Sequence, residues 1–537
     1  MSLKPDFMDH SKKIISYLFP SVGNIIFLLF FLYLSFLGGQ GLLADGDTGY
    51  HIRAGQYILE NFSIPKHDIF SYHTPPIPWT AHEWLSEVIM AWVHNYFGLN
   101  GIVFFFSFLI ALIFYLLFKF IRTYDGNIII STLLVILAAL TSSLHWLARP
   151  HIFSLLLMLI WYFMLDEYQY RNRKVLFFMP FIMLLWVNLH GGFITGFLFL
   201  GIYFLGNFIG AITSVGEKRS VFKKKAKYYL FIIVLCLVTA LINPYGYQIL
   251  LFPFSFISNK FLMDNVAEFL SPNFHSPEVL LFELFLLFTI TIFLVSVRRL
   301  NPIEVLLFIF FAHMSFYSIR YIPLFSLIIS PILIKKIGFL IQESNTKTCV
   351  KFLNKSKKYA DIDRITKGFL WPGIGFLLSS LGIALGIVNF QFDENIKPIK
   401  AVEFIKTEHI KGNMFNNDEF GDVIIYSAFP QYKVFFDGRS DMYGNEKIKE
   451  YRKVLEFKPG WEDIIKKYKI QWIFFDNDSP LSRYLLERND WKLIFSDKVA
   501  NIFLKNTAEF SHLIEKYKNV KPYIKDESDK KNNIPIH

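Results

Sequence analysis

The sequence predicts a polytopic α-helical membrane protein of about eleven spans that carries a small α/β domain near its C-terminal end. Of the 537 residues, 53% are hydrophobic, 61 are Phe and only 18% are charged. Soluble domains carry about 25% charged residues. The apolar residues form runs close to the ~20 residues that cross a bilayer, whereas the composition after residue 390 becomes that of a soluble domain.

Eleven apolar runs are long enough to be membrane spans. The first is too long for the apolar region of a signal peptide and lacks a small-residue cleavage site, so we expect it to remain as a span. Residues 1–21 then form a cytoplasmic N-terminus, and residues 22–390 form a transmembrane domain. The expected spans are 22–42, 101–121, 127–147, 150–167, 174–190, 193–213, 228–248, 278–297, 302–319, 321–339 and 369–389.

Basic residues between the spans set the expected orientation. With eleven spans, all basic clusters lie on one side, which we take as cytoplasmic because cytoplasmic loops are rich in Lys and Arg. These loops explain the net charge of +11, so we expect no nucleic-acid partner. Cys236 lies in an apolar run and Cys349 in a basic loop, and we expect no disulfide. The clusters are Lys4, Lys12 and Lys13; Lys119 and Arg122; Arg171, Arg173 and Lys174; Lys218 to Lys225; Arg298 and Arg299; and Lys335 to Lys367.

Polar stretches gather on the opposite, extracytoplasmic side. Ionisable groups at membrane depth are costly, and they usually face a cavity or a pathway. Because these stretches share one side, we expect them to contribute to one site. They are residues 44–55, 145–153, 186–193, 242–248 together with 266–275, and 318–323.

The first outer loop, residues 44–100, is long. An apolar residue recurs every four positions from Tyr50 to Phe62, and residues 84–92 carry a second apolar stripe at helical spacing. Both patterns predict amphipathic helices on the membrane surface, joined by a proline-rich loop.

Two carboxylates stand where the first of these helices begins, in the stretch ADGDTGYHIRAG at 44–55. Asp47 directly precedes the helical pattern and can cap it by accepting backbone N–H bonds. For Asp45, a capping or solvated role and a chemical role both stay open.

Residues 391–516 are expected to form a small extracytoplasmic α/β domain, since the odd number of spans places them outside the cytoplasm. Residues 517–537 are rich in Lys, and we expect a disordered tail. The segments MFNNDEFGDVIIY, KVFFDGR, IQWIFFD and WKLIFSDKVANIFLK predict strands, and residues 399–409, 445–468 and 480–488 predict helices.

Several motifs resemble known membrane glycosyltransferases. A long first outer loop with surface helices and an Asp just after the first span resembles the GT-C class. DTGYHIRAG (47–55) and PKHDIFSYHTPPIPWTAHEWLSE (65–87) are similar to the first loop of oligosaccharyltransferase catalytic subunits. The phrases ARPHIFSLLL, NLHGGF, NPYG, RYIPLF and FDGRSDMYG resemble a group of bacterial membrane proteins described as glycosyltransferase-like. The resemblance covers most of the chain, and its motifs are short.

The resemblance implies a GT-C-like enzyme of the bacterial inner membrane. Such an enzyme moves a sugar from a polyprenyl-phosphate-linked donor to an envelope acceptor (a glycan, lipid or protein) on the extracytoplasmic side, among membrane lipids. An acceptor hydroxyl must lose a proton as it attacks, and a carboxylate can take that proton. Asp47 fits this catalytic role, with Asp45 as the second candidate.

The lipid-phosphate leaving group requires cations, because negative charge grows on it. Arg149, His151, His190 and Arg320 fit that requirement, and Arg320 begins RYIPLF at the outer end of a span. The other candidates for substrate contact are His51, Arg53, Glu83, Asn188, Tyr245, Asp437 and Arg439.

Each of these residues has a structural alternative. Arg149 and Arg320 can anchor helices at the interface, and Tyr245 can belong to an aromatic belt. His190 can be an ordinary hydrogen-bonded polar group, and Asn188 a turn or cap residue. Residues 437–441 can be turn and salt-bridge residues, as NDEFGDVIIY lacks the tryptophans with which oligosaccharyltransferases bind a peptide.

No cofactor is expected. Some GT-C enzymes bind a divalent ion, and Asp45, Asp47 and Glu83 or Glu87 offer the clustered carboxylates that a hard cation requires. The second outer loop, however, lacks the Asp-x-Asp-like pair that oligosaccharyltransferases have there. The resemblance therefore does not imply that this protein depends on a metal ion. HEWLSE (82–87) is not the HExxH pattern of zinc enzymes.

A second class of function stays open, that of a transporter or a non-catalytic polytopic membrane protein. Transporters show broken helices with charges near mid-membrane and paired halves. Here the charges cluster at one face beside a long loop, which favours an enzyme. A polymerase or ligase of lipid-linked glycans would share the same substrates.

Overall fold

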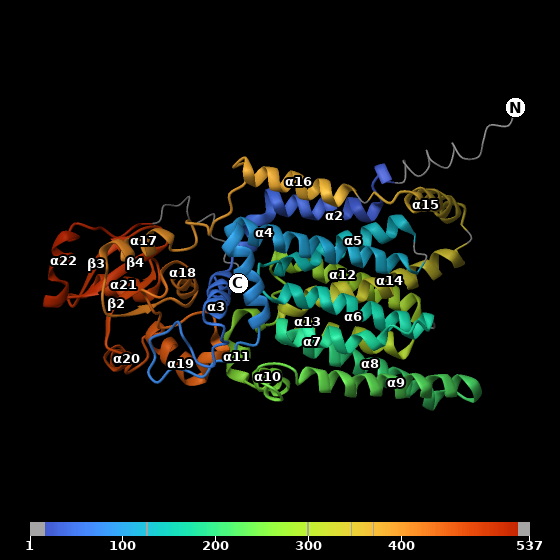
Figure 1. Cartoon of the computed structure of the whole chain (residues 1–537), viewed down its shortest axis with the longest axis horizontal. Coiled ribbons are helices and arrows are strands. Elements are labelled where there is room, and N and C mark those ends of the chain that lie inside the picture. The colour runs from blue at the N-terminus through green and yellow to red at the C-terminus, as the bar shows by residue number, and fades with distance from the viewer. Residues whose placement is uncertain (1–16, 125–126, 298–299, 345, 369, 525–537) are drawn as a thin grey trace. The chain divides into compact units, whose positions relative to one another are not determined.

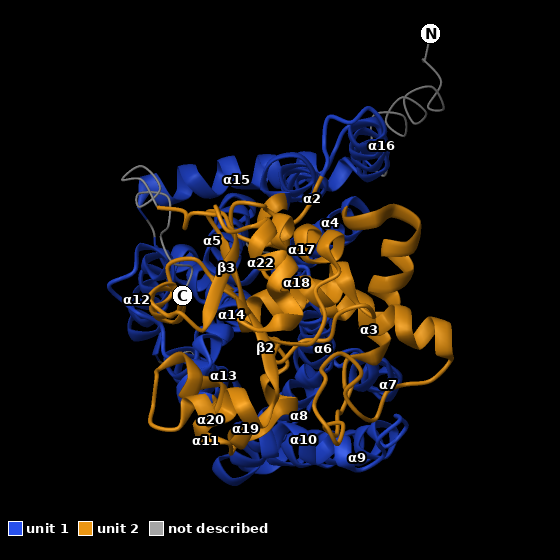
Figure 2. Ribbon diagram, turned by 90° about the vertical axis from the view of Figure 1, so that its left-hand side faces the viewer, with its two compact units in different colours: residues 1–39, 100–257, 263–389 blue, residues 40–99, 258–262, 390–537 orange. Residues whose placement is uncertain are grey.

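The computed structural model describes residues 17–124, 127–297, 300–344, 346–368 and 370–524. The chain forms two compact units: residues 1–39, 100–257 and 263–389, and residues 40–99, 258–262 and 390–537 (Figure 2). The second unit therefore combines the predicted first outer loop with the C-terminal segment. Lys4, Lys12, Lys13, Arg298, Arg299 and residues 525–537 of the predicted tail lie outside the described residues.

Helices build the first unit, as the sequence predicts (Figure 1). Two pairs, α2 with α16 and α8 with α9, lie side by side in it. Its core is rich in aromatic side chains, and Trp161 and Trp186 are fully buried. The helices are α2 (Val22–Tyr33), the later part of α4 (Trp84–Arg122), α5 (Ile128–Ser142), α6 (His151–Arg171), α7 (Met179–Leu189), α8 (Ile194–Thr213), α9 (Gly216–Ala240), α10 (Gln248–Ile257), α12 (Leu280–Val295), α13 (Pro302–Tyr317), α14 (Ile322–Glu343), α15 (Lys347–Ile365) and α16 (Leu370–Ala384); α11 (Lys260–Asn265) runs across the boundary between the units.

Each predicted span coincides, in whole or in part, with a helix. Among the described residues, seven helices are long and apolar enough to cross a membrane, and an eighth results if the bent pair Lys347–Ile365 and Leu370–Ala384 counts as one span. Two other predicted spans correspond to the shorter apolar helices Leu176–Leu189 and Pro302–Tyr317. The chain is an integral membrane protein of the predicted class. The number eleven, and with it the side on which each loop lies, stays a prediction.

The buried charged residues of α6, α13 and α14 in the first unit are paired. Lys336 donates to Glu304 Oε2 at 2.6 Å, and both side chains are almost fully buried. Arg171 donates to Asp166 Oδ2 at 3.1 Å and to Glu167 Oε1 at 2.7 Å. An unpaired charge in an apolar interior is strongly unfavourable, so these pairs explain how α6, α13 and α14 accommodate ionisable groups.

The second unit opens with α3 (Asp47–Asn61). Asp45 Oδ1 accepts a hydrogen bond from the Asp47 N–H at 2.9 Å, so Asp45, rather than Asp47, holds the turn at which this helix starts. Most of the predicted apolar stripe is buried, but Phe62 is 93% exposed because it follows the helix in a left-handed conformation.

Glycines let α3 approach its neighbours closely. A methyl group on Gly49 would lie 2.9 Å from the carbonyl oxygen of Asp422 in α18 (Asp418–Ala428), and one on Gly55 would lie 1.9 Å from the carbonyl oxygen of Glu87 in α4. The glycines of ADGDTGYHIRAG are thus required for backbone packing. This packing fixes the carboxylates of the same stretch against α18.

The early part of α4 belongs to the second unit and ends at a break. Gly98 has φ 60° and ψ −157°, so a separate surface segment precedes the predicted span at 101–121. This segment buries Glu87, Met90 and Ala91, while Trp92 on the predicted apolar stripe is 55% exposed. The other residues of that stripe are half-buried, so a position of this helix on the membrane surface stays a prediction.

Four strands form the sheet of the second unit, in the order β1-β2-β4-β3. β1 runs parallel to β2, and β4 is antiparallel to both β2 and β3. The central β2 is buried along most of its length, as expected for a strand covered on both faces. The strands are β1 (Asn413–Asn416), β2 (Ile470–Asp476), β3 (Trp491–Ser496) and β4 (Ala500–Lys505), and the helices are α17 (Ile399–Glu408), α18, α19 (Ser440–Leu455), α20 (Trp461–Lys467), α21 (Pro480–Leu486) and α22 (Ser511–Lys516).

Two strand predictions are wrong. DEFGDVIIY is the helix α18, because Asn417 caps it by accepting the Phe420 N–H, and the apolar Phe420, Val423 and Ile424 share a buried face. KVFFDGR forms no regular strand; of these residues only Val434 makes an isolated bridge, with Ser71 of the first outer loop.

Candidate active site

The carboxylate of Asp47 meets the C-terminal segment at Gly438. A methyl group added at Gly438 would lie 2.2 Å from Asp47 Oδ1 and 3.1 Å from Asp422 Oδ2, so both carboxyl groups border one small space. Asp47 is 8% exposed and Asp422 is 1% exposed. The Gly438 N–H also donates to Asp422 Oδ1 at 3.2 Å. The structure thus brings together two carboxyl groups that are 375 positions apart in the sequence (422 minus 47).

Asp422 is held in its protonated form more readily than an ordinary Asp. Burial, together with the neighbouring carboxylates of Asp47, Asp437 and Asp45, raises the pKa of Asp422 well above its usual range, although the Gly438 N–H opposes this. A carboxyl pair that holds one proton can accept or release a proton during a reaction.

We expect the stability of the second unit to depend on this proton. The folded chain binds it more tightly than the unfolded chain, so its stabilising effect is complete below the ordinary Asp pKa of about 3.9 and is lost as the pH rises through the raised pKa of Asp422. Each pH unit in this window lowers the free energy of unfolding by up to about 1.4 kcal/mol.

Asp422→Asn should remove that pH dependence. The measurement is the urea midpoint of protease resistance of the second unit, in the full chain in nanodiscs, at several pH values. Asp490→Asn, at an exposed carboxylate of the same unit, is the matched control. If wild type and Asp422→Asn show the same pH dependence, the buried proton is not held by Asp422.

Arg439 forms a buried ion cluster beside this pair. Its Nε and Nη2 donate to Asp437 at 2.8 and 2.7 Å, and Nη2 also donates to Asp68 Oδ1 at 2.8 Å. Tyr443 donates its hydroxyl proton to Asp437 at 2.7 Å. Asp437 and Arg439, both predicted as substrate contacts, therefore bind one another and join the first outer loop to the C-terminal segment.

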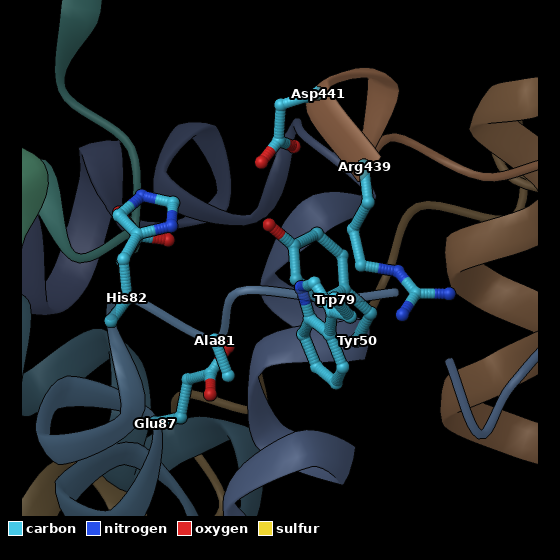
Figure 3. A pocket seen from close by; sticks show the side chains of 8 residues that line it. Tyr50, Trp79, Ala81, His82, Glu87, Arg439 and Asp441 are labelled. Atoms are coloured by element: carbon cyan, nitrogen blue, oxygen red, sulfur yellow. The ribbon is translucent and has the colours of Figure 1, made fainter. Parts of the chain in front are cut away.

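Glu83 lines a pocket that begins at Tyr50, one turn along α3 from Asp47, and His51 contacts two of its glutamates. His51 Nδ1 lies 3.2 Å from Glu87 Oε1, and His51 Nε2 lies 3.7 Å from Glu83 Oε2. Figure 3 shows this pocket, which Tyr50, Trp79, Ala81, His82, Glu83, Glu87, Arg439 and Asp441 line. Arg53 is placed differently, since it donates to the Tyr426 carbonyl at 2.7 Å and to Gln56 at 2.9 Å, which anchors α3 on α18.

The described residues contain no group of three or more His, Cys, Asp or Glu side chains arranged to hold a metal ion. No step below is assigned to a metal.

In the first unit, Arg149 and Arg320 meet on one carboxylate. Arg149 Nη1 donates to Glu268 Oε1 at 2.6 Å, and Arg320 Nε lies 3.3 Å from Glu268 Oε2. Burial raises the pKa of Glu268, but the charges of Arg149 and Arg320 outweigh burial and hold it well below its usual range. Two guanidinium groups around one carboxylate leave an excess of one positive charge.

The other candidates in the first unit have structural contacts. His151 donates from Nε2 to the His145 carbonyl at 2.9 Å, and its ring lies 4.4 Å from the His145 ring. His190 Nδ1 accepts from the Gly192 N–H, and Asn188 donates to the carbonyls of Leu184 and Ile242. Tyr245 lies in the turn that Asn243 stabilises.

Asp422, Asp68 and Glu268 were not among the predicted site residues. Asp422 had a usable signal, because it is a carboxylate on the otherwise apolar stretch FGDVII. Asp68 carries no such signal, since it is an acidic residue in a polar loop and its partner Arg439 is far away in the sequence. Glu268 belongs to the polar stretch 266–275, which was expected at one site with 145–153 and 318–323, but its pairing with Arg149 and Arg320 was not predicted.

No protein family model and no curated protein sequence matches the chain. Two of the solved structures that share its fold are archaeal oligosaccharyltransferases. The archaeal oligosaccharyltransferase AglB from Archaeoglobus fulgidus, in complex with an inhibitory peptide and a dolichol-phosphate, superposes with a TM-score of 0.54 and 11% identity over 85% of this chain and 69% of that one. The apo form of an oligosaccharyltransferase from the same organism gives 0.53 and 11% over 91% and 74%. The chain thus shares the fold of these two oligosaccharyltransferase structures.

Proposed function

We propose that the protein is a membrane glycosyltransferase that moves a sugar from a polyprenyl-phosphate-linked donor to an envelope acceptor. The observation that carries this proposal is the buried pair of Asp47 and Asp422 at Gly438, on the fold of an oligosaccharyltransferase. The solved AglB structure holds a dolichol-phosphate, which supports a lipid-phosphate donor. The acceptor is an envelope glycan, lipid or protein.

Asp47 takes the proton in the proposed reaction. The oxygen of an acceptor hydroxyl attacks the anomeric carbon, a new C–O bond forms, and the hydroxyl proton passes to Asp47. The bond between the anomeric carbon and the phosphate oxygen breaks, and the lipid phosphate leaves with the electron pair. The negative charge of Asp47 also favours the oxocarbenium-like transition state. Asp422 keeps its own proton next to Asp47 and positions it.

Arg149 and Arg320 of the first unit bind the lipid phosphate in this proposal. Both guanidinium groups form ion pairs with the same carboxylate, that of Glu268, so their spacing allows them to bind one anion together. Glu268 then competes with the phosphate for the same N–H groups.

Glu268→Gln is expected to strengthen binding of polyprenyl phosphate, because it removes the competing charge. A charge-assisted hydrogen bond contributes about 1.5 kcal/mol, so gaining one should lower the Kd roughly tenfold. Arg149→Gln should weaken binding by a similar factor, and Glu278→Gln, at an exposed position in the short 3-10 helix Pro277–Val279 of the same unit, should change nothing. Titration of the protein in nanodiscs with polyprenyl phosphate gives the three constants. Equal Kd values in Glu268→Gln and wild type would place the phosphate elsewhere.

The proposal places the protein in the bacterial inner membrane, with its N-terminus in the cytoplasm and its C-terminal domain outside. A sugar built on a polyprenyl phosphate is presented on that outer side, where an envelope acceptor is available. The basic clusters between the helices support this orientation.

Profiling of envelope glycolipids and glycoproteins by mass spectrometry tests the function. Three strains are compared: one with wild-type protein, one with Asp47→Asn at equal membrane abundance, and one without the protein. We expect one glycan to be missing from both the Asp47→Asn and the null strain, and that glycan names the product. If Asp47→Asn matches wild type while the null strain differs, a transporter or scaffold explains the protein better.

A further inference from the structure

Helix α15 (Lys347–Ile365) runs across the direction of its neighbours in the first unit. It meets α16 at a bend of 76°. In Figure 1, α2, α5 and α16 run across the view and α15 is seen end-on, whereas in Figure 2 α15 runs across the view. Six basic and two acidic residues among its 19 are too much charge for a membrane span. Its direction and its charge both favour a position along a membrane surface.

The inner face of α15 is fixed on the first residues of two other helices. Ser356 is buried and accepts a hydrogen bond from the Ile128 N–H at 3.2 Å, where α5 begins. Asp363 accepts one from the Val22 N–H at 2.6 Å, where α2 begins. Ser356 and Asp363 are seven residues apart, so they lie about two turns apart on one face of the helix. Because this face is held at two points, the direction of the exposed face is fixed as well.

Basic and apolar side chains share the exposed face of α15. Lys351, Lys355, Lys358, Ile362 and Ile365 follow one another at the spacing of one helix stripe (i, i+4, i+7, i+11, i+14), and all five are exposed. Ile362 is 52% exposed, and Tyr359 beside it is 50% exposed. Exposed isoleucines are unfavourable in water but not at the boundary between lipid headgroups and acyl chains. The long stems of lysines reach from that depth to the headgroups.

The charge of α15 selects the kind of surface. Its six basic and two acidic residues give a net charge of +4 (six minus two). Of the acidic residues, Asp363 faces inward to Val22, and Asp361 lies 3.9 Å from Arg364, away from the stripe of lysines and isoleucines. A nucleic acid or an acidic soluble protein would match the lysines but not the isoleucines. A bilayer surface with anionic headgroups matches both.

We propose that α15 is an interfacial helix that binds anionic lipid headgroups. Its lysines contact the lipid phosphates, and Ile362 and Ile365 enter the boundary between headgroups and acyl chains. Because α2 and α5 begin directly after basic clusters, these lipids belong to the leaflet that the sequence predicts to be cytoplasmic. None of these residues takes part in the proposed reaction, so lipid binding and sugar transfer can be tested independently.

The depth of α15 can be measured with an NBD fluorophore on the full-length protein in nanodiscs of phosphatidylcholine and phosphatidylglycerol. Cys349→Ser removes the accessible thiol, and Cys236 is buried. The label stands at Ile362→Cys or, as the matched control, at Lys357→Cys, an exposed position about 140° around the same helix. Lipid with a doxyl group on its acyl chain should quench the label at 362 severalfold more than the label at 357. Equal quenching would leave this face to a soluble partner and overturn the inference.

Selectivity for anionic lipid is measured by titrating short-chain phosphatidylglycerol and counting the bound lipids by native mass spectrometry. A lysine near an anionic surface strengthens binding about fivefold, so Lys351→Gln, Lys355→Gln and Lys358→Gln together should raise the Kd at least about tenfold. Lys218→Gln, Lys223→Gln and Lys224→Gln remove three exposed lysines of α9, where no isoleucine stripe accompanies them, and should change the Kd by at most about twofold. An equal change in both triple variants, or none in that of α15, overturns the inference.

Discussion

Gly438→Ala is expected to slow sugar transfer strongly while the protein stays folded. The added methyl group would meet Asp47 Oδ1 at 2.2 Å and Asp422 Oδ2 at 3.1 Å, and the flexible end of the Asp47 side chain has to move away. The Asp47 carboxylate keeps its negative charge, but it no longer lies where it can accept the proton. A correctly placed general base contributes about 10²–10⁴-fold to a rate, so the rate of transfer should fall by about that factor.

Gly41→Ala is the matched control for Gly438→Ala. Gly41 belongs to the same unit, and a methyl group there would meet nothing within 4 Å. Its transfer rate should equal that of wild type. Full activity of Gly438→Ala would mean that the position of the Asp47 carboxylate at Gly438 does not matter for the reaction.

Arg439→Met should strongly destabilise the second unit. Removal of the guanidinium leaves Asp68 and Asp437 as buried carboxylates without their counter-ion, each at most 7% exposed. Breaking a buried ion pair by removing one partner costs about 3–5 kcal/mol. The urea midpoint of protease resistance of this unit in the full-length protein measures the loss.

Arg488→Met tests whether burial is the reason. Arg488 also contacts two carboxylates, Asp490 at 2.7 Å and Glu462 at 3.3 Å, but its side chain is 36% exposed. Exposed pairs contribute little to stability, so this variant should keep the wild-type midpoint. Similar midpoints for Arg439→Met and Arg488→Met would show that the buried cluster does not hold the unit together.

The fold class was predictable because it depends on composition and local pattern. Apolar runs of about 20 residues define the helices of the first unit, and IQWIFFD is a buried strand in both prediction and structure. The segment DEFGDVIIY misled the prediction, since the consecutive Val423, Ile424 and Ile425 are typical of strands. The cap formed by Asn417 and the packing of this segment on α3 stabilise a helix instead.

The site was predictable only in part, because its geometry depends on distant partners. Asp47 and Arg439 stand out as charged groups beside unusual motifs, but the meeting of Asp68 with Arg439 joins positions 371 residues apart. Gly438 was interpreted as turn chemistry, whereas its missing side chain makes room for Asp47. No local sequence pattern predicts that a glycine leaves room for a side chain from a distant part of the chain. Arg149 and Arg320 were expected at a phosphate and the stretch 266–275 near them, but no local pattern predicts that Glu268 pairs with both arginines.

Conversion of the lipid donor tests the proposed chemistry most directly. Purified full-length protein in nanodiscs is incubated with polar membrane lipids from cells that lack it, in which donor and acceptor are both unconsumed. Mass spectrometry follows each polyprenyl-phosphate sugar. We expect wild-type protein to convert one of them into polyprenyl phosphate or diphosphate with a matching gain of one sugar on an acceptor, and Asp47→Asn to convert none. Unchanged donor with wild-type protein, or equal conversion by Asp47→Asn, would contradict a glycosyltransferase that uses Asp47.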